Sequence, residues 1–369
     1  MCEAKFESYV GVDLHKTTLT IGCLDPDKNI RKVQAIDTKC VDKIVALIAD
    51  LPRPIACAIE SVGMYEWLWE LLEDKVDRLV LADAAEVKRA RKRGKAKTDR
   101  NDALLLARLL LIGEVPTAYV PNKTFRTLRK LGRYYHRVSQ MLADVKIQMR
   151  WRLNQNNARG PKSINSASAQ RWLLAHGHRL DSSSLFAYKQ QLGLIERLEI
   201  DKISIVREMK LIAKDERFEK DMKLIMSVPG IGPVIGFIIY AEIADFSRFP
   251  SGDAIACYTG LTTQTNESAG KYRVGHITKC GNATLRWALV EAATTLIQHD
   301  QTFQRMHQQI VLNKGADTSI NRHIAKIAIA QRLPRYLRAM MLSGEKFKKG
   351  EPTNRQAKLN QARLKKNAG

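Results

Sequence analysis

Short apolar runs separated by polar turns dominate the first hundred residues and predict β-strands. The runs lie at 9–13, 18–24, 32–36, 55–60 and 78–82. Apolar residues also recur at helical spacing over 41–49 and 61–73, and a leucine- and alanine-rich helix is expected to follow the N-cap residue Thr98. Three strands followed by alternating helices and strands predict a mixed five-stranded sheet with helices on its faces.

After residue 123 the apolar positions alternate by three and four, which predicts a long amphipathic helix. Its seam consists of Leu128, Leu131, Tyr135, Val138, Leu142, Val145 and Met149, flanked by many arginines and lysines. A polar break at 154–168 precedes a second helix at about 192–213, whose seam Lys202 interrupts. An antiparallel hairpin, a coiled coil to another protomer and a plain connecting bundle all fit this pattern.

A tight Pro-Gly-Ile-Gly-Pro turn at 229–233 lies between two further predicted helices. Gly230 and Gly232 allow backbone amides to approach a phosphate at the start of the helix that Pro233 opens. The pattern resembles a helix-hairpin-helix, a clamp on the DNA backbone that does not depend on base sequence. An ordinary glycine-rich turn between two helices is the alternative.

The remaining chain combines helices with one long polar segment. A short helix at 251–258 precedes the glycine-punctuated segment 261–286, which is predicted to be a loop, and a helix passing through Val290 and Ala293 follows. A helical region is expected after Asp300, with a break or kink at Pro334. The basic stretch 346–369 is expected to be disordered when free.

Charge narrows the choice of partner more than overall composition does. The 369 residues include 61 Lys and Arg against 38 Asp and Glu, which gives a net charge of +23. Such an excess favours a polyanionic partner, nucleic acid before an acidic membrane. No apolar run reaches membrane-spanning length and the N-terminus has no signal-peptide core, so a cytosolic protein is expected. The six cysteines show no metal-binding spacing.

Four acidic residues lie at positions where functional sites tend to form. Asp13 and Glu60 each end a predicted strand, and sites form at the carboxyl ends of strands in open α/β sheets. Asp99 and Asp102 are three residues apart in the first turn of the helix after Thr98, so their carboxylates share one face. Singly, these acids also fit turn residues or acids that complement a helix dipole. Together they are hard oxygen ligands that suit Mg²⁺ or Mn²⁺.

Basic residues lie beside these acids and also around a serine near the C-terminus. The candidate nucleic-acid contacts beside the acids are Lys95, Lys97 and Arg100. Ser268 lies among cations that can stabilise a charged phosphoryl transition state: Lys271, Arg273, Lys279 and Arg286. Taken alone, a serine in a polar loop is usually only a loop residue.

Two sets of motifs follow one another along the chain. The first reads Gly-Val-Asp-Leu-His-Lys at 11–16, Ile-Glu at 59–60 and Lys-Thr-Asp-Arg-Asn-Asp-Ala at 97–103. The second reads Val-Pro-Gly-Ile-Gly at 228–232 and Gly-His-Ile-Thr-Lys-Cys-Gly-Asn-Ala-Thr-Leu-Arg at 275–286. In these motifs and in their order, the chain resembles the insertion sequence 110 family of DEDD transposases, the RNA-guided bridge recombinases.

The resemblance implies a RuvC-like domain in which Asp13, Glu60, Asp99 and Asp102 form a Mg²⁺-binding tetrad. It also implies that Ser268 Oγ attacks the scissile phosphate, leaving a covalent phosphoserine, and that strands are exchanged without hydrolysis. The surrounding Glu-Ser-Ala-Gly lacks the serine doublets and paired glycines that are usual there. The implied parts are a RuvC-like catalytic domain at 1–120, a helical spacer at 121–218, a C-terminal transposase domain at 219–345 and the basic tail at 346–369.

The partners implied by the resemblance are donor and target double-stranded DNA and a structured non-coding guide RNA. Guide pairing would then read sequence while the protein contacts the backbone. A homodimer or tetramer is expected, acting at the nucleoid in a bacterial cytoplasm and without a membrane. Two other functions fit the residues: a RuvC-like structure-selective endonuclease that activates water, and a non-catalytic nucleic-acid-binding protein.

The net charge of +23 predicts that nucleic-acid affinity falls steeply as salt is added. If about six phosphates are contacted, the affinity for duplex DNA should drop about a thousandfold between roughly 50 and 200 mM salt. Fluorescence anisotropy at several salt concentrations measures this slope. An affinity that does not change with salt would exclude binding through the backbone.

Overall fold

The computed structural model describes residues 6–90, 98–268 and 271–348, and within 264–274 it describes the backbone alone. The chain divides into two compact units, Met1–Val120 and Pro121–Gly369. In the described residues, two hydrophobic cores lie in the first unit and one lies in the second.

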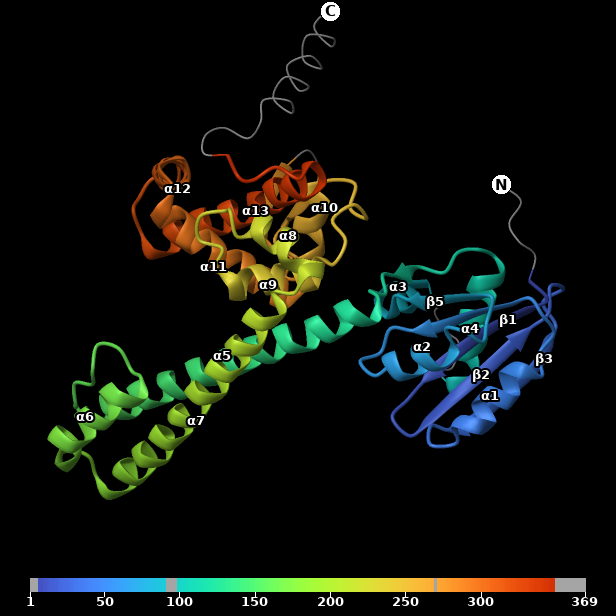
Figure 1. The fold of residues 1–369 in the computed structure, drawn as a ribbon, viewed down its shortest axis with the longest axis horizontal. Helices are drawn as coiled ribbons and strands as arrows, with labels where there is room; N and C mark the ends of the chain where they lie inside the picture. The colour runs from blue at the N-terminus through green and yellow to red at the C-terminus, as the bar shows by residue number, and fades with distance from the viewer. Residues whose placement is uncertain (1–5, 91–97, 269–270, 349–369) are drawn as a thin grey trace, which may run out of the picture. The chain divides into compact units, whose positions relative to one another are not determined.

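The N-terminal unit is built on one mixed sheet (Figure 1). Its strands are β1 (Ser8–Leu14), β2 (Thr18–Leu24), β3 (Ile30–Asp37), β4 (Ile55–Glu60), β5 (Arg78–Ala82) and β6 (Thr117–Ala118). Their order in the sheet is β3-β2-β1-β4-β5-β6. β1 pairs antiparallel with β2 and parallel with β4, β4 pairs parallel with β5, and the outer strands β3 and β6 are antiparallel to their neighbours. The carboxyl ends of β1, β4 and β5 therefore lie at one edge.

Helices cover both faces of this sheet. They are α1 (Val41–Ala49), α2 (Glu66–Leu72), α3 (Ala84–Ala90) and α4 (Asp99–Leu111). α1 and α2 share a core with Val10 and Val12 of β1, whereas α3 and α4 share a second core with Tyr9. Because successive side chains of a strand point to opposite faces, Gly11 and Asp13 belong to the face that α4 covers.

α4 lies directly on β1 because β1 has no side chain at Gly11. A Cβ atom there would lie 2.1 Å from the carbonyl oxygen of Ala103 and 2.6 Å from the backbone nitrogen of Ala107. Both alanines are fully buried. This close approach fixes the position of α4, and with it the first turn of α4, relative to the end of β1.

The mixed sheet with helices on its faces confirms the predicted fold class for this unit, with a correction: the sheet has six strands, not five. The additional strand, β6, contains only two residues, too few to show an alternating pattern. α2 also begins five residues later than expected, at Glu66. The residues before it form turns, in which the backbone nitrogen of Val62 donates to the carbonyl oxygen of Glu60 at 2.8 Å.

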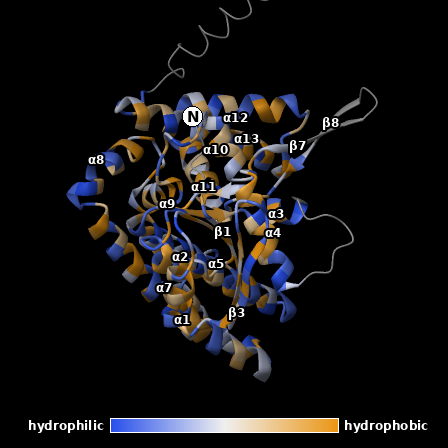
Figure 2. Ribbon diagram, turned by 90° about the vertical axis from the view of Figure 1, so that its right-hand side faces the viewer, coloured by the Kyte–Doolittle hydropathy of each residue, from blue (hydrophilic) through white to orange (hydrophobic). Residues whose placement is uncertain are grey.

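The C-terminal unit is mostly helical. Its helices are α5 (Lys123–Gln155), α6 (Ser166–His176), a 3₁₀ helix (Gly177–Arg179), α7 (Ser182–Ile212), α8 (Glu216–Ile225), α9 (Pro233–Ile243), α10 (Gly252–Tyr258), α11 (Ala283–His299), α12 (Gln301–Asn313) and α13 (Ser319–Ser343). One hydrophobic core runs from Leu128 of α5 to Met340 of α13, and hydrophilic and hydrophobic residues alternate along α12 and α13 (Figure 2). Within the described ranges, no helix is both long and apolar enough to cross a membrane.

α5 and α7 form an antiparallel pair within one chain. Lys202 Nζ lies 5.1 Å from the ring centre of Tyr135, Lys146 pairs with Glu199 at 3.5 Å, and Asn156 Nδ2 donates to Ser184 Oγ at 3.0 Å. Partner numbers in α7 fall as those in α5 rise, so of the three arrangements that fit the sequence the structure has the hairpin.

Two helical segments were not expected from the apolar pattern. α6 occupies part of the predicted polar break, and α7 begins at Ser182, ten residues before the predicted start. The sequence features that indicate these two helix starts are N-cap residues rather than apolar spacing. Asn165 forms a capping box with Ser168, and the side chain of Asp181 accepts a hydrogen bond from the backbone nitrogen of Ser184.

The segment predicted as a polar loop contains a β-hairpin, β7 (Thr263–Ser268) and β8 (Lys271–Ile277). The strands pair antiparallel from Thr263 opposite Ile277 to Ser268 opposite Lys271. Every residue of β7 is polar, so no alternation of apolar residues indicates a strand.

Of the break or kink predicted at Pro334, the break is wrong, because α13 continues through this residue to Ser343. Pro334 is buried, and the fully buried Leu333 and Leu337 anchor the helix on either side of it. Packing of these side chains offsets the backbone hydrogen bond that proline removes.

Replacement of Gly11 by alanine should destabilise the N-terminal unit by about 1–3 kcal/mol, because the added Cβ atom has no space against α4. Urea unfolding of the variant measures this loss. Gly63→Ala is the matched control, since a Cβ atom at Gly63 would meet none of the described residues within 4 Å. Equal stabilities of the two variants would show that α4 does not depend on the close approach.

Candidate active site

The two strand-end acids occupy neighbouring positions at the carboxyl edge of the sheet. β1 and β4 are parallel, and their last pair is Val12 with Ile59. One residue further, the same register places Asp13 beside Glu60. Since Gly11 and Asp13 share a face of β1, and Glu60 occupies the equivalent position on β4, both acids belong to the face that α4 covers.

The first turn of α4 lies at the same edge. Thr98 caps the helix, with its Oγ1 accepting a hydrogen bond from the backbone nitrogen of Asn101 at 3.2 Å, as predicted from the sequence. Asp99 and Asp102 both lie in this turn. Asp102 is close enough to Asp13 to raise the pKa of Asp13.

His15 connects the strand end to the helix start. Its Nε2 atom lies 3.3 Å from Asp13 Oδ2 and 3.3 Å from Asp99 Oδ1. One ligand atom from each of these three residues lies within 4.8 Å of the others. Of the four predicted ligands, this group therefore contains Asp13 and Asp99, while Glu60 and Asp102 lie outside it.

His15 had no predicted role, although the sequence offers a signal. It follows Asp13 by two residues, and side chains two apart in an extended chain point to the same side. A histidine in this position beside a strand-end acid is a second potential ligand or a cationic partner for the acid.

Burial dominates the electrostatics of Asp13. The side chain is only 5% exposed, and burial raises the pKa of Asp13, as do the negative charges of Asp102 and Asp99. His15 acts in the opposite direction and lowers this pKa. The raised pKa means that ionised Asp13 destabilises the folded protein when no cation is bound.

A divalent cation fits this position. Among the described residues, Asp13 Oδ2 accepts no hydrogen bond of good geometry, although it is buried. A buried carboxylate oxygen without a well-aligned donor is unfavourable, and a cation would interact with it favourably while reducing the repulsion from Asp99. Carboxylate oxygens are ligands that Mg²⁺ and Mn²⁺ prefer, whereas the His15 nitrogen suits softer metals as well.

The predicted nucleic-acid contacts near this edge are only partly described. Arg100 is exposed in the first turn of α4, whereas Lys95 and Lys97 lie outside the described residues. For Ser268, Lys271 and Arg273 of the hairpin, the structure describes the backbone alone. Ser268 and Lys271 form the pair furthest from Thr263 and Ile277, and Arg273 lies two pairs closer.

The other two predicted basic contacts lie beyond β8. Lys279 is exposed and has a positive φ of 54°. Arg286 Nη1 donates to the carbonyl oxygens of Thr259 at 2.7 Å and Lys279 at 3.2 Å, so this nitrogen holds the backbone beside the hairpin.

The Pro-Gly-Ile-Gly-Pro turn connects α8 to α9, as its pattern predicted. Gly230 has a φ of +93°, and a Cβ atom there would lie 2.7 Å from the backbone nitrogen of Leu296 in α11. Gly232 is the exposed N-cap of α9, where a Cβ atom would meet none of the described residues within 4 Å, and Pro233 follows as the first helical residue. The two glycines thus differ: the first is required by packing against α11, and the second leaves the helix start open.

A transposase family model of the DEDD type matches residues 10–157, a range that contains the two strand-end acids and the two acids at the helix start. A second family model, that of the IS116/IS110/IS902 transposases, matches residues 222–308. Both models describe transposases of the IS110 group, and the chain belongs to this family.

Curated relatives are similar over different lengths. A putative transposase (y4pF/y4sB) of Sinorhizobium fredii is 31% identical over 140 residues, 38% of this chain and 36% of the relative. The transposase of insertion sequence element IS1111A from Coxiella burnetii is 29% identical over 92 residues, 25% of this chain and 24% of the relative. A second putative transposase of Sinorhizobium fredii (y4qE) is 23% identical over 295 residues, 78% of this chain and 72% of the relative. The chain thus spans about a third or less of the first two relatives.

Asp13→Asn should stabilise the metal-free protein at pH 7, because burial and neighbouring acids raise the pKa of Asp13 in the folded state. A carboxyl with a raised pKa is destabilising when ionised, so the gain should disappear as the pH falls below the ordinary pKa of aspartate. Thermal unfolding in a chelator at several pH values measures this effect.

The same variant should lose most of the stabilisation that Mn²⁺ gives the wild-type protein. Asp74→Asn, at an exposed acid, is the control and should change neither quantity. If Asp13→Asn binds Mn²⁺ as tightly as the wild-type protein does, the assignment of the cation site is wrong.

Proposed function

We propose that this protein is a DNA transposase that cleaves and rejoins strands at the carboxylate edge of the N-terminal sheet. The observation that carries the proposal is the buried Asp13, whose Oδ2 accepts no hydrogen bond of good geometry from the described residues and lies beside Asp99 and His15. Membership of the transposase family supplies the reaction class. A buried acid whose pKa is raised by burial and by neighbouring acids, as at Asp13, is typical of functional sites.

The residues that would hold Mg²⁺ or Mn²⁺ are Asp13 and Asp99, with Glu60 and Asp102 at the same edge and His15 between the first two. A bound divalent ion supplies charge neutralisation at the scissile phosphate and polarises its oxygens. The role of these side chains would be to hold the ion in place beside the phosphate. Arg100, and Lys95 and Lys97 before it, would bind the neighbouring phosphates.

The proposed nucleophile is Ser268. Its Oγ attacks the phosphorus, the phosphorus–oxygen bond to one DNA strand breaks, and that strand leaves as a free hydroxyl while a phosphoserine ester forms. The hydroxyl of another strand then attacks the phosphoserine and releases the serine, so the phosphodiester bond is re-formed without hydrolysis. Lys271, Arg273, Lys279 and Arg286 are candidates to stabilise the charged phosphoryl group.

The position of Ser268 on the hairpin is compatible with this role. Ser268 is in the residue pair of β7 and β8 furthest from the base, where Thr263 pairs with Ile277. A strand of this length spans about 20 Å, so the serine is presented well away from the base of the hairpin.

The proposal includes the nucleic acids that such a reaction needs. Donor and target duplex DNA are the substrates, and a structured non-coding RNA would select them by base pairing. The net charge of +23 supports contacts with several phosphate backbones. Strand exchange between two duplexes also requires at least two active sites, which supports a homodimer or tetramer.

An endonuclease that activates water is the second candidate, because the described acid site lies wholly in the N-terminal unit. Such an enzyme would need the carboxylates and not Ser268. The two functions therefore differ in whether a covalent protein–DNA adduct forms.

Ser268→Ala should abolish the adduct and reduce cleavage by about 10³-fold or more, because the nucleophile is lost. Denaturing gels of the protein with labelled DNA ends and its own element's RNA measure both quantities. Thr263→Ala, at an exposed position at the other end of β7, is the control and should retain activity. Cleavage by Ser268→Ala at the wild-type rate would favour the endonuclease.

A further inference from the structure

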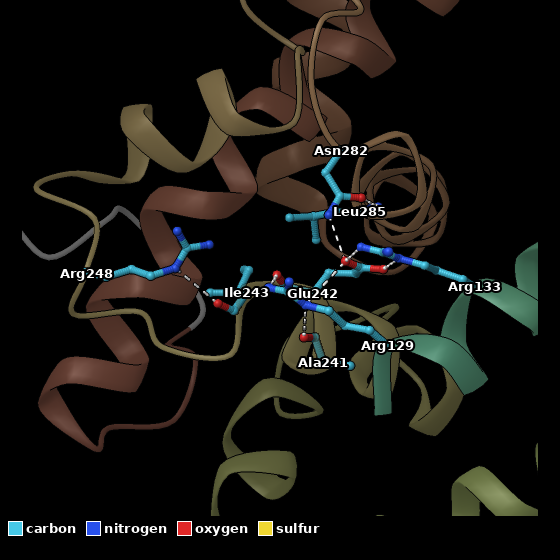
Figure 3. Close-up of polar contacts among 8 residues, drawn as sticks. All are labelled: Arg129, Arg133, Ala241, Glu242, Ile243, Arg248, Asn282 and Leu285. Atoms are coloured by element: carbon cyan, nitrogen blue, oxygen red, sulfur yellow. Dashed lines mark hydrogen bonds and ion pairs between the residues drawn. The ribbon is translucent and has the colours of Figure 1, made fainter. Parts of the chain in front are cut away.

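A second buried carboxylate lies in the C-terminal unit, where three segments meet. Glu242 is the penultimate residue of α9, and its side chain is 1% exposed. Arg133 of α5 donates through Nε to Oε1 at 2.7 Å and through Nη2 to Oε2 at 2.9 Å. Asn282, at the start of α11, donates through Nδ2 to Oε2 at 2.8 Å (Figure 3). Both carboxylate oxygens of Glu242 therefore accept hydrogen bonds.

Two more arginines hold the backbone at this end of α9. Arg129 donates through Nε to the carbonyl oxygen of Ala241 at 3.0 Å and through Nη2 to that of Glu242 at 2.6 Å. Arg248 donates through Nε to the carbonyl oxygen of Ile243 at 3.4 Å. Figure 3 shows these side chains directed at the helix end, where the last carbonyl groups lack partners within the helix.

The chain leaves α9 through a strained turn. Ala244 has φ 64° and ψ −63°, and the backbone nitrogen of Asp245 donates to the carbonyl oxygen of Ile243 at 2.8 Å. This is the rare form of the γ-turn, which persists only where its surroundings hold it. A buried ion pair adds little net stability, so the reason for this cluster is better sought in the arrangement that it fixes.

Asn282 joins the cluster to the hairpin. Its Oδ1 accepts a hydrogen bond from the backbone nitrogen of Leu285 at 3.0 Å and caps α11, while its own backbone nitrogen donates to the carbonyl oxygen of Tyr258 at 2.9 Å. With Oδ1 used by the cap, Nδ2 must be the atom that faces Glu242. Asparagine is thus required here, because aspartate would cap the helix equally well but would repel Glu242.

The segment before Asn282 forms one side of the base of the hairpin, and the segment before β7 forms the other. The backbone nitrogens of Thr278 and Lys279 donate to the carbonyl oxygens of Thr262 at 2.8 Å and Gly260 at 3.1 Å. A Cβ atom at Gly260 would lie 2.6 Å from the carbonyl oxygen of Cys280, so the two sides are in direct backbone contact. The two sides of the base are therefore joined by direct backbone contacts and by Arg286 Nη1, and Asn282 attaches the base to α9.

We infer that Glu242 is a positioning residue, which sets through Asn282 the direction in which the β7–β8 hairpin leaves the unit. This inference rests on the proposed role of Ser268, which lies at the far end of that hairpin. A tilt of about 10° at the base of a strand about 20 Å long moves its far end by about 3 Å. Since a misplacement of about 1 Å at a reacting atom costs about a hundredfold in rate, Glu242 controls the rate without touching DNA.

The test uses Asn282→Asp, which keeps the cap of α11 but removes the donor to Glu242. The rate of adduct formation should fall about a hundredfold, while the affinity for DNA changes by less than about twofold. Asn122→Asp is the matched control, because Asn122 caps α5 through the same bond, at 3.0 Å from the backbone nitrogen of Phe125. It should leave the rate unchanged.

The double variant E242Q/N282D keeps the total charge and lets the new amide donate to the new carboxylate, but the new amide cannot accept the hydrogen bond that Arg133 Nη2 gives to Oε2. It should therefore recover only part of the adduct rate that Asn282→Asp loses. A rate for Asn282→Asp equal to that of Asn122→Asp, or equal losses of rate and DNA affinity, would overturn the inference. If Asn282→Asp does not fold, Asn282→Ser, which keeps a cap oxygen but lacks the donor, takes its place.

Amide hydrogen exchange separates this inference from the proposed function. Loss of the Glu242 bond should accelerate exchange by about tenfold in 258–262 and 278–282, while exchange in the core of α13 stays unchanged. Unchanged exchange at the base would refute the inference even if Ser268 is the nucleophile. Persistence of the adduct in Ser268→Ala would instead refute the proposed function and leave the exchange result standing.

Discussion

The contact between α4 and β1 at Gly11 is the constraint on which the N-terminal site depends. The acids cannot assemble themselves, since Asp99 and Asp102 both repel ionised Asp13 in the absence of a cation. Backbone packing brings them together instead: Ala103 and Ala107 lie against Gly11, and this leaves the first turn of the same helix beside the end of β1. The energy that holds the site together therefore comes from the buried apolar face of α4, remote from the charges.

An acidic edge within a protein of charge +23 has a consequence for the proposed DNA substrate. Phosphates are attracted to the basic surface as a whole but repelled by uncovered carboxylates. A divalent cation reverses the sign of the potential at this edge, and only then can a phosphate approach Asp13 and Asp99 closely. Cation binding and DNA binding are thus expected to be coupled, each increasing the affinity for the other.

The sequence predicted those parts of the fold and site whose signals are local. β2, β4, β5 and α1 coincide with their predicted ranges, because each has a clear apolar period between turns. Strand ends and a helix start identified four acids, of which Asp13 and Asp99 lie in one group of ligand atoms. His15 was missed because its contact with Asp99 spans 84 positions of sequence. The hairpin was missed because β7 is wholly polar, and Glu242 because an apolar run cannot show which buried polar groups have partners.

The two buried carboxylates show how the proposed active site differs from a structural ion pair in this chain. Their side chains are 5% exposed at Asp13 and 1% at Glu242. Glu242 accepts hydrogen bonds from Arg133 and Asn282 at its two carboxylate oxygens and from Arg129 at its carbonyl oxygen, so none of these oxygens lacks a donor. Asp13 has two acidic neighbours and an oxygen without a well-formed hydrogen bond from the described residues. A buried carboxylate without well-formed hydrogen bonds favours a bound cation, whereas one with donors to both oxygens fixes a local geometry. The proposed reaction, which uses a cation site and a serine on a hairpin, needs one of each.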